Sequence, residues 1–166
     1  MKNETQMQLV TKDLRNEIVS DWRNDYNDLV SLRLAAEQGD ADAQFRLAEF
    51  YYKRHEECCG AEADLEEAVK WYQEAAGRGD ARAQFEIGWF YQSGEGIGED
   101  HEKAVGWYRI SAEQGYARAQ YWLGWCYQYG WGVEADLEEA VKWYGIAAEQ
   151  GNEEALEDLM ELGLIS

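Results

Sequence analysis

The sequence predicts an all-α protein, an α/α superhelical solenoid of antiparallel helix pairs. The first observation is an internal repeat, Ala-Val-x-Trp-Tyr-x-x-x-Ala-x-x-Gly, which occurs three times and ends at Gly79, Gly115 and Gly151. These glycines are spaced 36 residues apart, a period typical of stacked helix-pair arrays. The second observation is the absence of proline, which suits a chain made almost wholly of helices joined by glycine turns. Such arrays usually bind other macromolecules and seldom catalyse reactions.

The repeat divides one continuous domain into a series of parts. Residues 1–40 are expected to form an N-terminal helical cap and an unpaired helix, which runs from Trp22 to Gln38. Three repeats should follow, each with a first helix, called helix A, and a second, called helix B; they span residues 41–79, 81–115 and 117–151. Residues 152–166 are expected to form a C-terminal capping helix whose inward side chains are Leu156, Leu159, Met160 and Leu162.

The third repeat gives the clearest helix boundaries. Helix A should begin near Ala117 and end near Tyr129, where a glycine-rich turn at residues 130–132 follows. Helix B should then run from Asp136 to about Gln150. Glycine closes helix B in every repeat, because the left-handed conformation at a helix end is least costly for glycine.

Aspartates stand where each helix B begins. A carboxylate at this position can accept hydrogen bonds from backbone N–H groups of the first helical turn. The expected N-caps are Asp64, Asp100 and Asp136, and Glu67 and Glu139 follow three residues later, where they could complete capping boxes.

The first repeat contains a four-residue insertion between Tyr51 and Asp64. It lacks the Gly-x-Gly pattern of the other turns, so we expect a longer turn at residues 53–60. The first repeat also has Ala48 where the others have Gly88 and Gly124, two glycines that would let neighbouring helices approach closely.

Composition indicates a folded protein without a membrane span. The 166 residues are 46% hydrophobic and include eight tryptophans and eleven tyrosines, which is ample material for a core. The 30% share of charged residues excludes a membrane-spanning helix, and residues 1–6 lack the apolar run of a signal peptide. We therefore expect a cytoplasmic protein, with Cys58, Cys59 and Cys126 as reduced thiols.

The net charge of −19 bears on the partner. Repulsion from phosphates argues against direct binding to nucleic acid or to an anionic membrane. A protein partner with a basic surface is compatible with this charge. The oligomeric state is left open.

The complete repeat pattern reads Ala-x-Ala-Gln-(aromatic)-x-Leu-Gly-x-x-Tyr, then Gly-x-Gly-(Ile/Val), then Asp-x-x-x-Ala-Val-x-Trp-Tyr-x-x-x-Ala-x-x-Gly. About ten positions recur together at residues 81–115 and 117–151. The pattern resembles the Sel1-like repeat family, which is related to the tetratricopeptide repeats. The resemblance implies a superhelical scaffold or adaptor for protein complexes, with partners held in a groove lined by the A helices.

Positions that are identical in all repeats are expected to serve packing. Trp71, Trp107 and Trp143 recur without exception, as do the tyrosines that follow them, Tyr72, Tyr108 and Tyr144. Each of these aromatic side chains can bury roughly 150 to 250 Å². We therefore expect all six in the core.

Aromatic residues that break the pattern are the candidates for binding. Tyr121, Trp125 and Tyr129 share one helical face, as do Phe85 and Trp89. By the resemblance this face lines the concave groove, with arginines one turn before it and glutamines one turn after. The candidate partner-binding residues are Arg82, Phe85, Trp89, Gln92, Arg118, Tyr121, Trp122, Trp125, Gln128 and Tyr129. Alternatively these aromatics pack between repeats, since Phe45, Phe85 and Tyr121 occupy one repeat position.

Carboxylates recur near the start of each helix B and form a second candidate surface, the acidic edge. Its residues are Glu62, Asp64, Glu66, Glu67, Glu99, Asp100, Glu102, Glu134, Asp136, Glu138 and Glu139. Favourable placement at helix N-termini is one explanation. The other is an acidic inhibitor that imitates a phosphate backbone and occupies the basic nucleic-acid-binding surface of another protein, for example a nuclease or defence complex.

The sequence offers no catalytic residues, metal site or cofactor site. His55 and His101 stand in no spacing that supplies a nucleophile with its base, or a structural zinc site. The group of His55, Glu56, Cys58 and Cys59 could bind a soft metal, but adjacent cysteines in a polar insertion are more typical of a loop. We therefore expect a non-enzymatic protein, with an accessory subunit of an enzyme as a third alternative.

Overall fold

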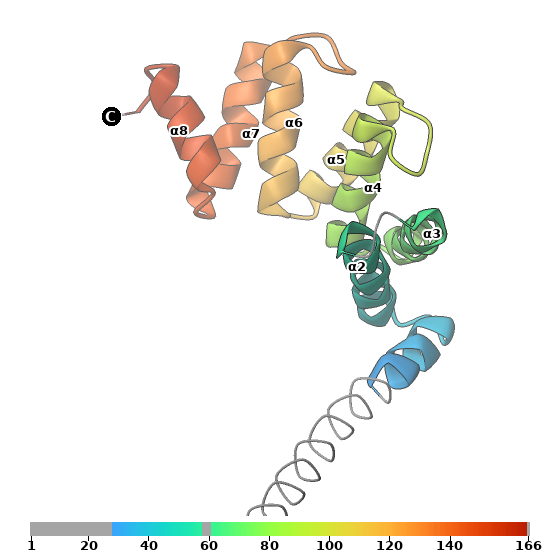
Figure 1. Cartoon of the computed structure of the whole chain (residues 1–166). Coiled ribbons are helices and arrows are strands. Elements are labelled where there is room, and N and C mark those ends of the chain that lie inside the picture. Colours follow the sequence, from blue (N-terminus) through green and yellow to red (C-terminus); the bar gives the residue numbers. More distant parts are fainter. Residues whose placement is uncertain (1–27, 58–60, 166) are drawn as a thin grey trace, which may run out of the picture.

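The computed structural model describes residues 28–57 and 61–165. Within these ranges every regular element is a helix, and residues 28–37 are helical before the labelled helices begin. The labelled helices are α2 (Ala41–Glu57), α3 (Glu62–Gly77), α4 (Ala81–Ser93), α5 (His101–Glu113), α6 (Ala117–Tyr129), α7 (Leu137–Glu149) and α8 (Glu153–Glu161) (Figure 1).

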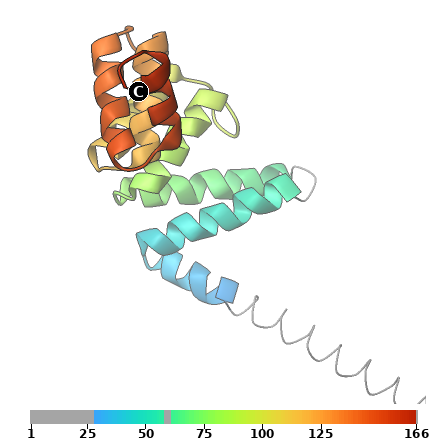
Figure 2. The ribbon, with the colours of Figure 1, turned by 90° about the vertical axis from the view of Figure 1, so that its left-hand side faces the viewer.

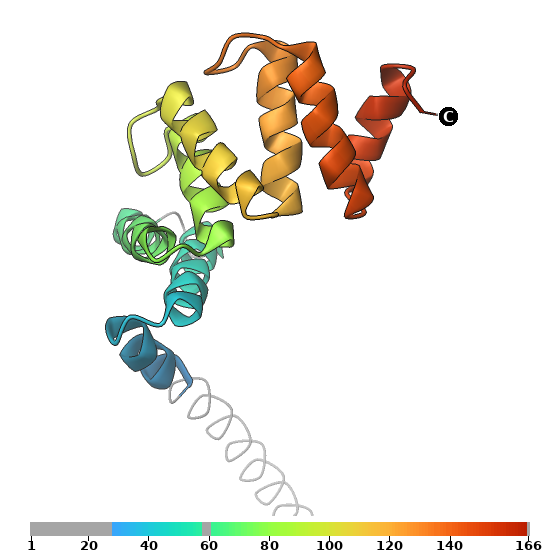
Figure 3. The same ribbon diagram turned by 180° about the vertical axis from the view of Figure 1, so that it is seen from behind.

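Successive helices pack as antiparallel pairs. Helix α2 pairs with α3, α4 with α5, and α6 with α7, while α3 contacts α4, α5 contacts α6, and α8 contacts α7. The A helices α4 and α6 lie on the side that Figure 1 shows, and the B helices α5 and α7 lie on the opposite side (Figure 3). The α2–α3 pair is turned steeply relative to the α6–α7 pair (Figure 2). The predicted all-α solenoid is therefore confirmed.

Glycines end the B helices as expected. Gly79, Gly115 and Gly151 have positive φ angles of 94°, 92° and 86°. At the first of these turns, the N–H of Asp80 donates to the carbonyl of Ala75 at 3.1 Å, which closes the end of α3. A side chain with a Cβ atom would be strained at these positions.

Two of the three predicted N-caps are confirmed. Asp100 accepts a hydrogen bond from the N–H of Lys103, and Asp136 accepts from the N–H groups of Glu138 and Glu139. The prediction for Asp64 is wrong, because α3 begins at Glu62 and the carboxylate of Asp64 accepts hydrogen bonds from Arg54 instead.

The capping boxes are also absent from the described helices. The Glu67 carboxylate accepts hydrogen bonds from Lys70 and from the indole N–H of Trp71. The Glu139 carboxylate accepts from Lys142. Both glutamates thus bond to residues later in their own helix. Two caps that the motif did not indicate are Asp80 at α4 and Asn152 at α8.

The insertion in the first repeat lengthens helix α2. The prediction of a longer turn beginning at residue 53 is therefore wrong. Helix α2 continues to Glu57, whereas α4 and α6 end just before Gly94 and Gly130, which adopt φ angles of 73° and 68°. Arg54 occupies the corresponding position in α2. Without a glycine to stop it, the helix continues, and the ion pair between Arg54 and Asp64 joins it to α3.

Close packing of tyrosine against glycine joins the helices of the second and third repeats. A Cβ atom at Gly88 would lie 2.7 Å from Cδ1 of Tyr108, and one at Gly124 would lie 2.8 Å from Cδ1 of Tyr144. Glycine is therefore required for these rings to pack where they do. Ala48 fills the same position in the first repeat and is completely buried.

The six recurrent aromatic residues are not all buried. Tyr72, Tyr108, Tyr144 and Trp71 belong to the core, as predicted. Trp107 and Trp143 are half-buried, so the prediction is wrong for them. Each packs against the core of the preceding repeat, which leaves one part of its ring at the surface.

The C-terminal helix α8 covers the end of the solenoid. Ala155 and Leu159 are buried against α7, and Leu156 and Leu162 are half-buried. Met160 is 51% exposed and does not point inward as predicted. Its position one residue after Leu159 turns it away from the core face of the helix.

The turn between α6 and α7 packs against the second repeat. The Trp131 ring stacks on His101 with 3.8 Å between ring centroids, and a Cβ atom at Gly132 would collide with the His101 carbonyl. Gly132 thus lets the turn approach α5 closely. Trp131 covers part of the neighbouring repeat. No helix among the described residues is both long and apolar enough to cross a bilayer.

Candidate protein-binding groove

A groove runs along the A-helix side of the first three helix pairs. It consists of two hollows, of about 480 Å³ and 180 Å³, that share Tyr52, Glu86 and Arg118 among their lining residues. Tyr52 comes from α2, Glu86 from α4 and Arg118 from α6. Because each repeat contributes one A helix, only the assembled solenoid forms this groove.

Three of the predicted binding residues line the groove: Phe85, Trp89 and Arg118. Trp89 borders the smaller hollow, where its ring lies edge-on to Tyr52 with centroids 6.1 Å apart. Arg118 extends from the first turn of α6, with its guanidinium 4.8 Å from the centroid of Phe85. The Arg118 side chain is 61% exposed and stands 4.0 Å from the carboxylate of Glu86.

Phe85 belongs to the core, which corrects its assignment to the binding surface. Only 2% of it is exposed, and its ring packs against Tyr108 and Tyr116 with centroids 5.4 and 5.6 Å away. Its ring forms the floor of the smaller hollow. For Phe85 the burial therefore favours the alternative explanation, that this aromatic residue serves packing.

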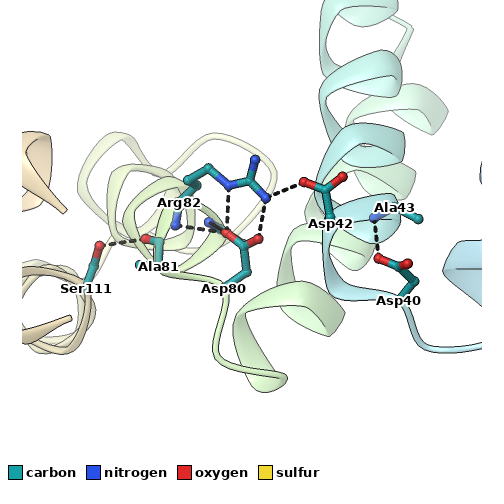
Figure 4. A network of polar contacts seen from close by, with 8 residues as sticks. Asp40, Asp42, Ala43, Asp80, Ala81, Arg82 and Ser111 are labelled. Atoms are coloured by element: carbon teal, nitrogen blue, oxygen red, sulfur yellow. Dashed lines mark hydrogen bonds and ion pairs between the residues drawn. The ribbon is translucent and has the colours of Figure 1, made fainter. Parts of the chain in front are cut away.

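Arg82 links the first two repeats (Figure 4). Its guanidinium donates to Asp80 at 2.6 Å and to Asp42 at 2.8 Å, and it lies 4.2 Å from the centroid of Phe45. Burial alone would raise the pKa of Asp80, but hydrogen bonds from Arg82 and from backbone N–H groups lower it. These contacts occupy the Arg82 head group within the chain.

Gln92 and Gln128 hold two core tyrosines in place. The Tyr108 hydroxyl donates to Oε1 of Gln92 at 2.6 Å, and the Tyr144 hydroxyl donates to Oε1 of Gln128 at 2.7 Å. A buried hydroxyl normally needs such a partner. Both amides thus have a structural role beside the groove.

The remaining candidate aromatics form a cluster on α6. Trp125 lies 5.7 Å from Trp122 and 4.9 Å from Tyr129, measured between ring centroids. Tyr129 is 59% exposed, whereas Trp122, Trp125 and Tyr121 are half-buried. Trp122 also packs near Tyr108 of the preceding repeat. These residues therefore combine packing between repeats with a partly open surface.

The sequence reasoning missed the polar lining of the groove. Glu49, Tyr52 and Glu56 of α2, Tyr72 of α3 and Glu86 of α4 all face the larger hollow. Burial raises the pKa of Glu86 and of Glu49, and burial together with nearby carboxylates raises the pKa of Tyr52 to about 12. The sequence contained one sign that the first repeat differs here, because Tyr52 stands where the other repeats have Gln92 and Gln128.

Most of the acidic edge is at the surface. Its exposed residues are Glu62, Glu66, Glu99, Glu102, Glu134, Asp136 and Glu138, while Glu67, Asp100 and Glu139 are half-buried. Lysines neutralise part of it, since Lys103 lies 2.9 Å from Asp100 and Lys142 lies 3.0 Å from Glu139. Asp64 is buried, and its hydrogen bond with Arg54 lowers its pKa. Asp64 therefore does not belong to the exposed edge.

The proposed soft-metal group is only partly described. His55 lies with Nδ1 2.9 Å from the carbonyl of Ala61 and Nε2 3.6 Å from Glu95. Cys58 and Cys59 lie outside the described residues. Among the residues that the structure does describe, no group of three or more His, Cys, Asp or Glu side chains is placed to hold a metal ion.

Known structures with similar folds come from several bacteria. A Sel1 repeat protein from Oxalobacter formigenes is 40% identical, with a TM-score of 0.71, and the match covers 81% of this chain and 98% of that one. The protein c5321, a protective antigen of uropathogenic Escherichia coli with an SLR fold, is 30% identical, with a TM-score of 0.56 and coverage of 82% and 37%. Cysteine rich protein B of Helicobacter pylori is 22% identical, with a TM-score of 0.56 and coverage of 72% and 96%, and shows the fold alone.

Comparison with protein families gives a consistent result. No curated protein matches the chain. The Sel1 repeat matches at residues 41–80, 81–116 and 117–152, which together make up more than half of the chain. This chain is therefore a member of the Sel1 repeat family.

Proposed function

We propose that this protein is a non-enzymatic scaffold that binds one protein partner in the groove lined by its A helices. Sel1 repeat proteins generally serve as scaffolds for protein–protein interactions. The observation that carries the proposal is the groove itself, to which Tyr52, Glu86 and Arg118 contribute from three consecutive repeats. A segment of a partner would be contacted by all three repeats at once.

Aromatic residues give this surface the composition of a binding site. Trp89 and Tyr52 border the smaller hollow, and Trp125 and Tyr129 continue the A-helix side on α6. Tryptophan, tyrosine and arginine are enriched among the residues that dominate binding energy at protein interfaces. Arg118 lies within this region and is largely exposed.

The proposal places the protein in the cytoplasm. The high charge and the buried, unpaired thiol of Cys126 suit a reducing compartment. Burial also raises the pKa of Cys126 to about 12, so the thiol stays protonated and unreactive.

The test is quantitative capture of a partner from a lysate of the native host, followed by affinity measurement with the purified partner. The double variant Trp89→Ala/Tyr129→Ala should lose capture while keeping its helical content. The matched control is Ile110→Ala/Leu137→Ala, which truncates two exposed apolar residues of the B helices. Equal loss in both variants, or unchanged binding in the first, would contradict the groove.

The exposed acidic edge favours a second candidate function, inhibition of a nucleic-acid-binding protein. Seven carboxylates of the edge are exposed, and they recur with each helix pair. Binding through them should weaken steeply with salt, because exposed charges are screened within a Debye length of roughly 8 Å at physiological ionic strength. Binding through the aromatic groove should persist at about 0.5 M salt, so the salt dependence separates the two candidates.

A further inference from the structure

The larger hollow of the groove has an unusual lining. It lies between α2, α3, α4 and the first turn of α6, and its volume is about 480 Å³. Glu49, Glu56 and Glu86 face it, together with the rings of Tyr52 and Tyr72. Carboxylates and aromatic faces are the two kinds of group that attract a cation in a partly enclosed site.

The charges around this hollow do not balance. Four carboxylates line it, those of Glu49, Glu56, Glu57 and Glu86, but only two cations, those of Lys53 and Arg118. Lys53 is 3.7 Å from Glu57, at the surface, and Arg118 is 4.0 Å from Glu86. The excess is therefore negative, in a place where burial already makes ionisation of Glu86 and Glu49 unfavourable.

Tyr72 supplies an independent observation. The equivalent tyrosines of the other repeats donate their hydroxyls to Gln92 and Gln128, but Tyr52 replaces that glutamine in the first repeat. Only 3% of Tyr72 is exposed, it lines the hollow, and its hydroxyl forms no hydrogen bond with any described residue. Although the ring is buried, the hydroxyl is not among the described buried polar atoms that lack a partner, so it reaches the hollow and keeps donor and acceptor capacity for a ligand.

We propose that this hollow receives a lysine or arginine side chain from an extended basic segment of the protein partner. The positive head group would pair with Glu49 and Glu86, while the aliphatic stem would lie against Tyr52 and Trp89. The charge excess excludes an acidic segment as the occupant. The inference rests on the proposed function, since it names the chemistry of the segment that the groove binds.

The experiment measures binding of a simple probe, a fluorescein-labelled, terminally blocked peptide in which lysine alternates with serine. Fluorescence anisotropy at physiological ionic strength gives its Kd for the full-length protein. Glu49→Gln/Glu86→Gln should raise the Kd about tenfold, because two charge-assisted contacts are lost. Tyr72→Phe should raise it about threefold through loss of one hydrogen bond.

A matched control separates the hollow from the overall charge. Glu66→Gln/Glu138→Gln removes the same two charges from the exposed acidic edge. It should change the Kd by less than about twofold, since isolated surface charges contribute little. Equal weakening by both double variants would overturn the inference, as would undetectable binding of the lysine peptide or equally tight binding of the same peptide with glutamate in place of lysine.

The purified natural partner distinguishes failure of this inference from failure of the proposed function. If the two double variants, Trp89→Ala/Tyr129→Ala and Glu49→Gln/Glu86→Gln, each lose partner binding, the proposed function and the basic-segment inference are both supported. Loss in the aromatic variant alone keeps the groove and overturns the basic segment. Retention in both variants overturns both.

Discussion

The hydroxyl of Tyr108 donates a hydrogen bond to Oε1 of Gln92, 2.6 Å away, and so joins α5 to α4. The third repeat repeats this bond between Tyr144 and Gln128 at 2.7 Å. In the first repeat the glutamine is replaced by Tyr52, and the Tyr72 hydroxyl faces the groove instead. The replacement of this glutamine thus removes a hydrogen bond between helices and leaves the Tyr72 hydroxyl at the groove.

Tyr108→Phe should lower the free energy of unfolding by about 1 kcal/mol, since the hydrogen bond to Gln92 is lost. Tyr72→Phe should leave stability almost unchanged, because the Tyr72 hydroxyl has no partner among the described residues. Urea unfolding followed by circular dichroism measures both. Equal destabilisation by the two substitutions would show that the Tyr72 hydroxyl is bonded in the folded protein.

Gly124→Ala should destabilise the protein by about 1 to 3 kcal/mol through overpacking, because the new methyl would lie 2.8 Å from Cδ1 of Tyr144. Gly145→Ala is the matched control on the neighbouring helix. A Cβ atom at position 145 would meet no neighbouring atom within 4 Å, so Gly145→Ala should stabilise the protein by about 0.5 to 1 kcal/mol through helix propensity. Thermal unfolding distinguishes the two signs, and a gain in stability for Gly124→Ala would contradict the close helix approach.

Asp80 should contribute to stability in a pH-dependent way. Despite its burial, hydrogen bonds from Arg82 and the backbone lower its pKa, so the folded state favours the ionised form. Its contribution should be present above the unfolded pKa of about 4 and be lost as pH falls further. Asp80→Asn should therefore show a smaller fall in Tm between about pH 5 and pH 3 than the wild type. Identical pH profiles would contradict this role for the Arg82 contacts.

The ionised carboxylate of Glu86 should lower stability, whereas that of Asp80 raises it. Burial raises its pKa, so the folded state binds the proton more tightly than the unfolded chain does. The ionised Glu86 should therefore lower the free energy of unfolding at neutral pH, compared with an uncharged side chain at this position. This loss should shrink as the pH falls toward the raised pKa. Glu86→Gln should raise Tm at neutral pH, with a smaller gain near about pH 4. A lower Tm at neutral pH would mean that the attraction to Arg118 outweighs burial.

The helix pairs were predictable because each repeat carries its own start and stop signals. Gly79, Gly115 and Gly151 all adopt the left-handed conformation that their spacing indicated. The extension of α2 was missed because it depends on a single replacement, Arg54 at the position of Gly94 and Gly130. A glycine that is missing is a weaker sequence signal than one that recurs.

The candidate site was less predictable because it forms between repeats. Glu49, Tyr52 and Glu86 share one hollow only because the solenoid brings α2 and α4 together at a particular angle. Helical periodicity places residues on a face of one helix, but it does not give the angle between helices. The same limit explains Phe85, whose face was identified while its burial by Tyr108 and Tyr116 was not.

The most direct test of the central claim is site-specific photo-cross-linking to the partner. The photoreactive residue benzoylphenylalanine would replace Trp89 in the groove, and in a second protein Ile110 on the opposite side. The account predicts a cross-link from position 89 to a lysine- or arginine-rich segment of the partner, and none from position 110. A cross-link from position 110 alone, or from position 89 to a segment without basic residues, would contradict it.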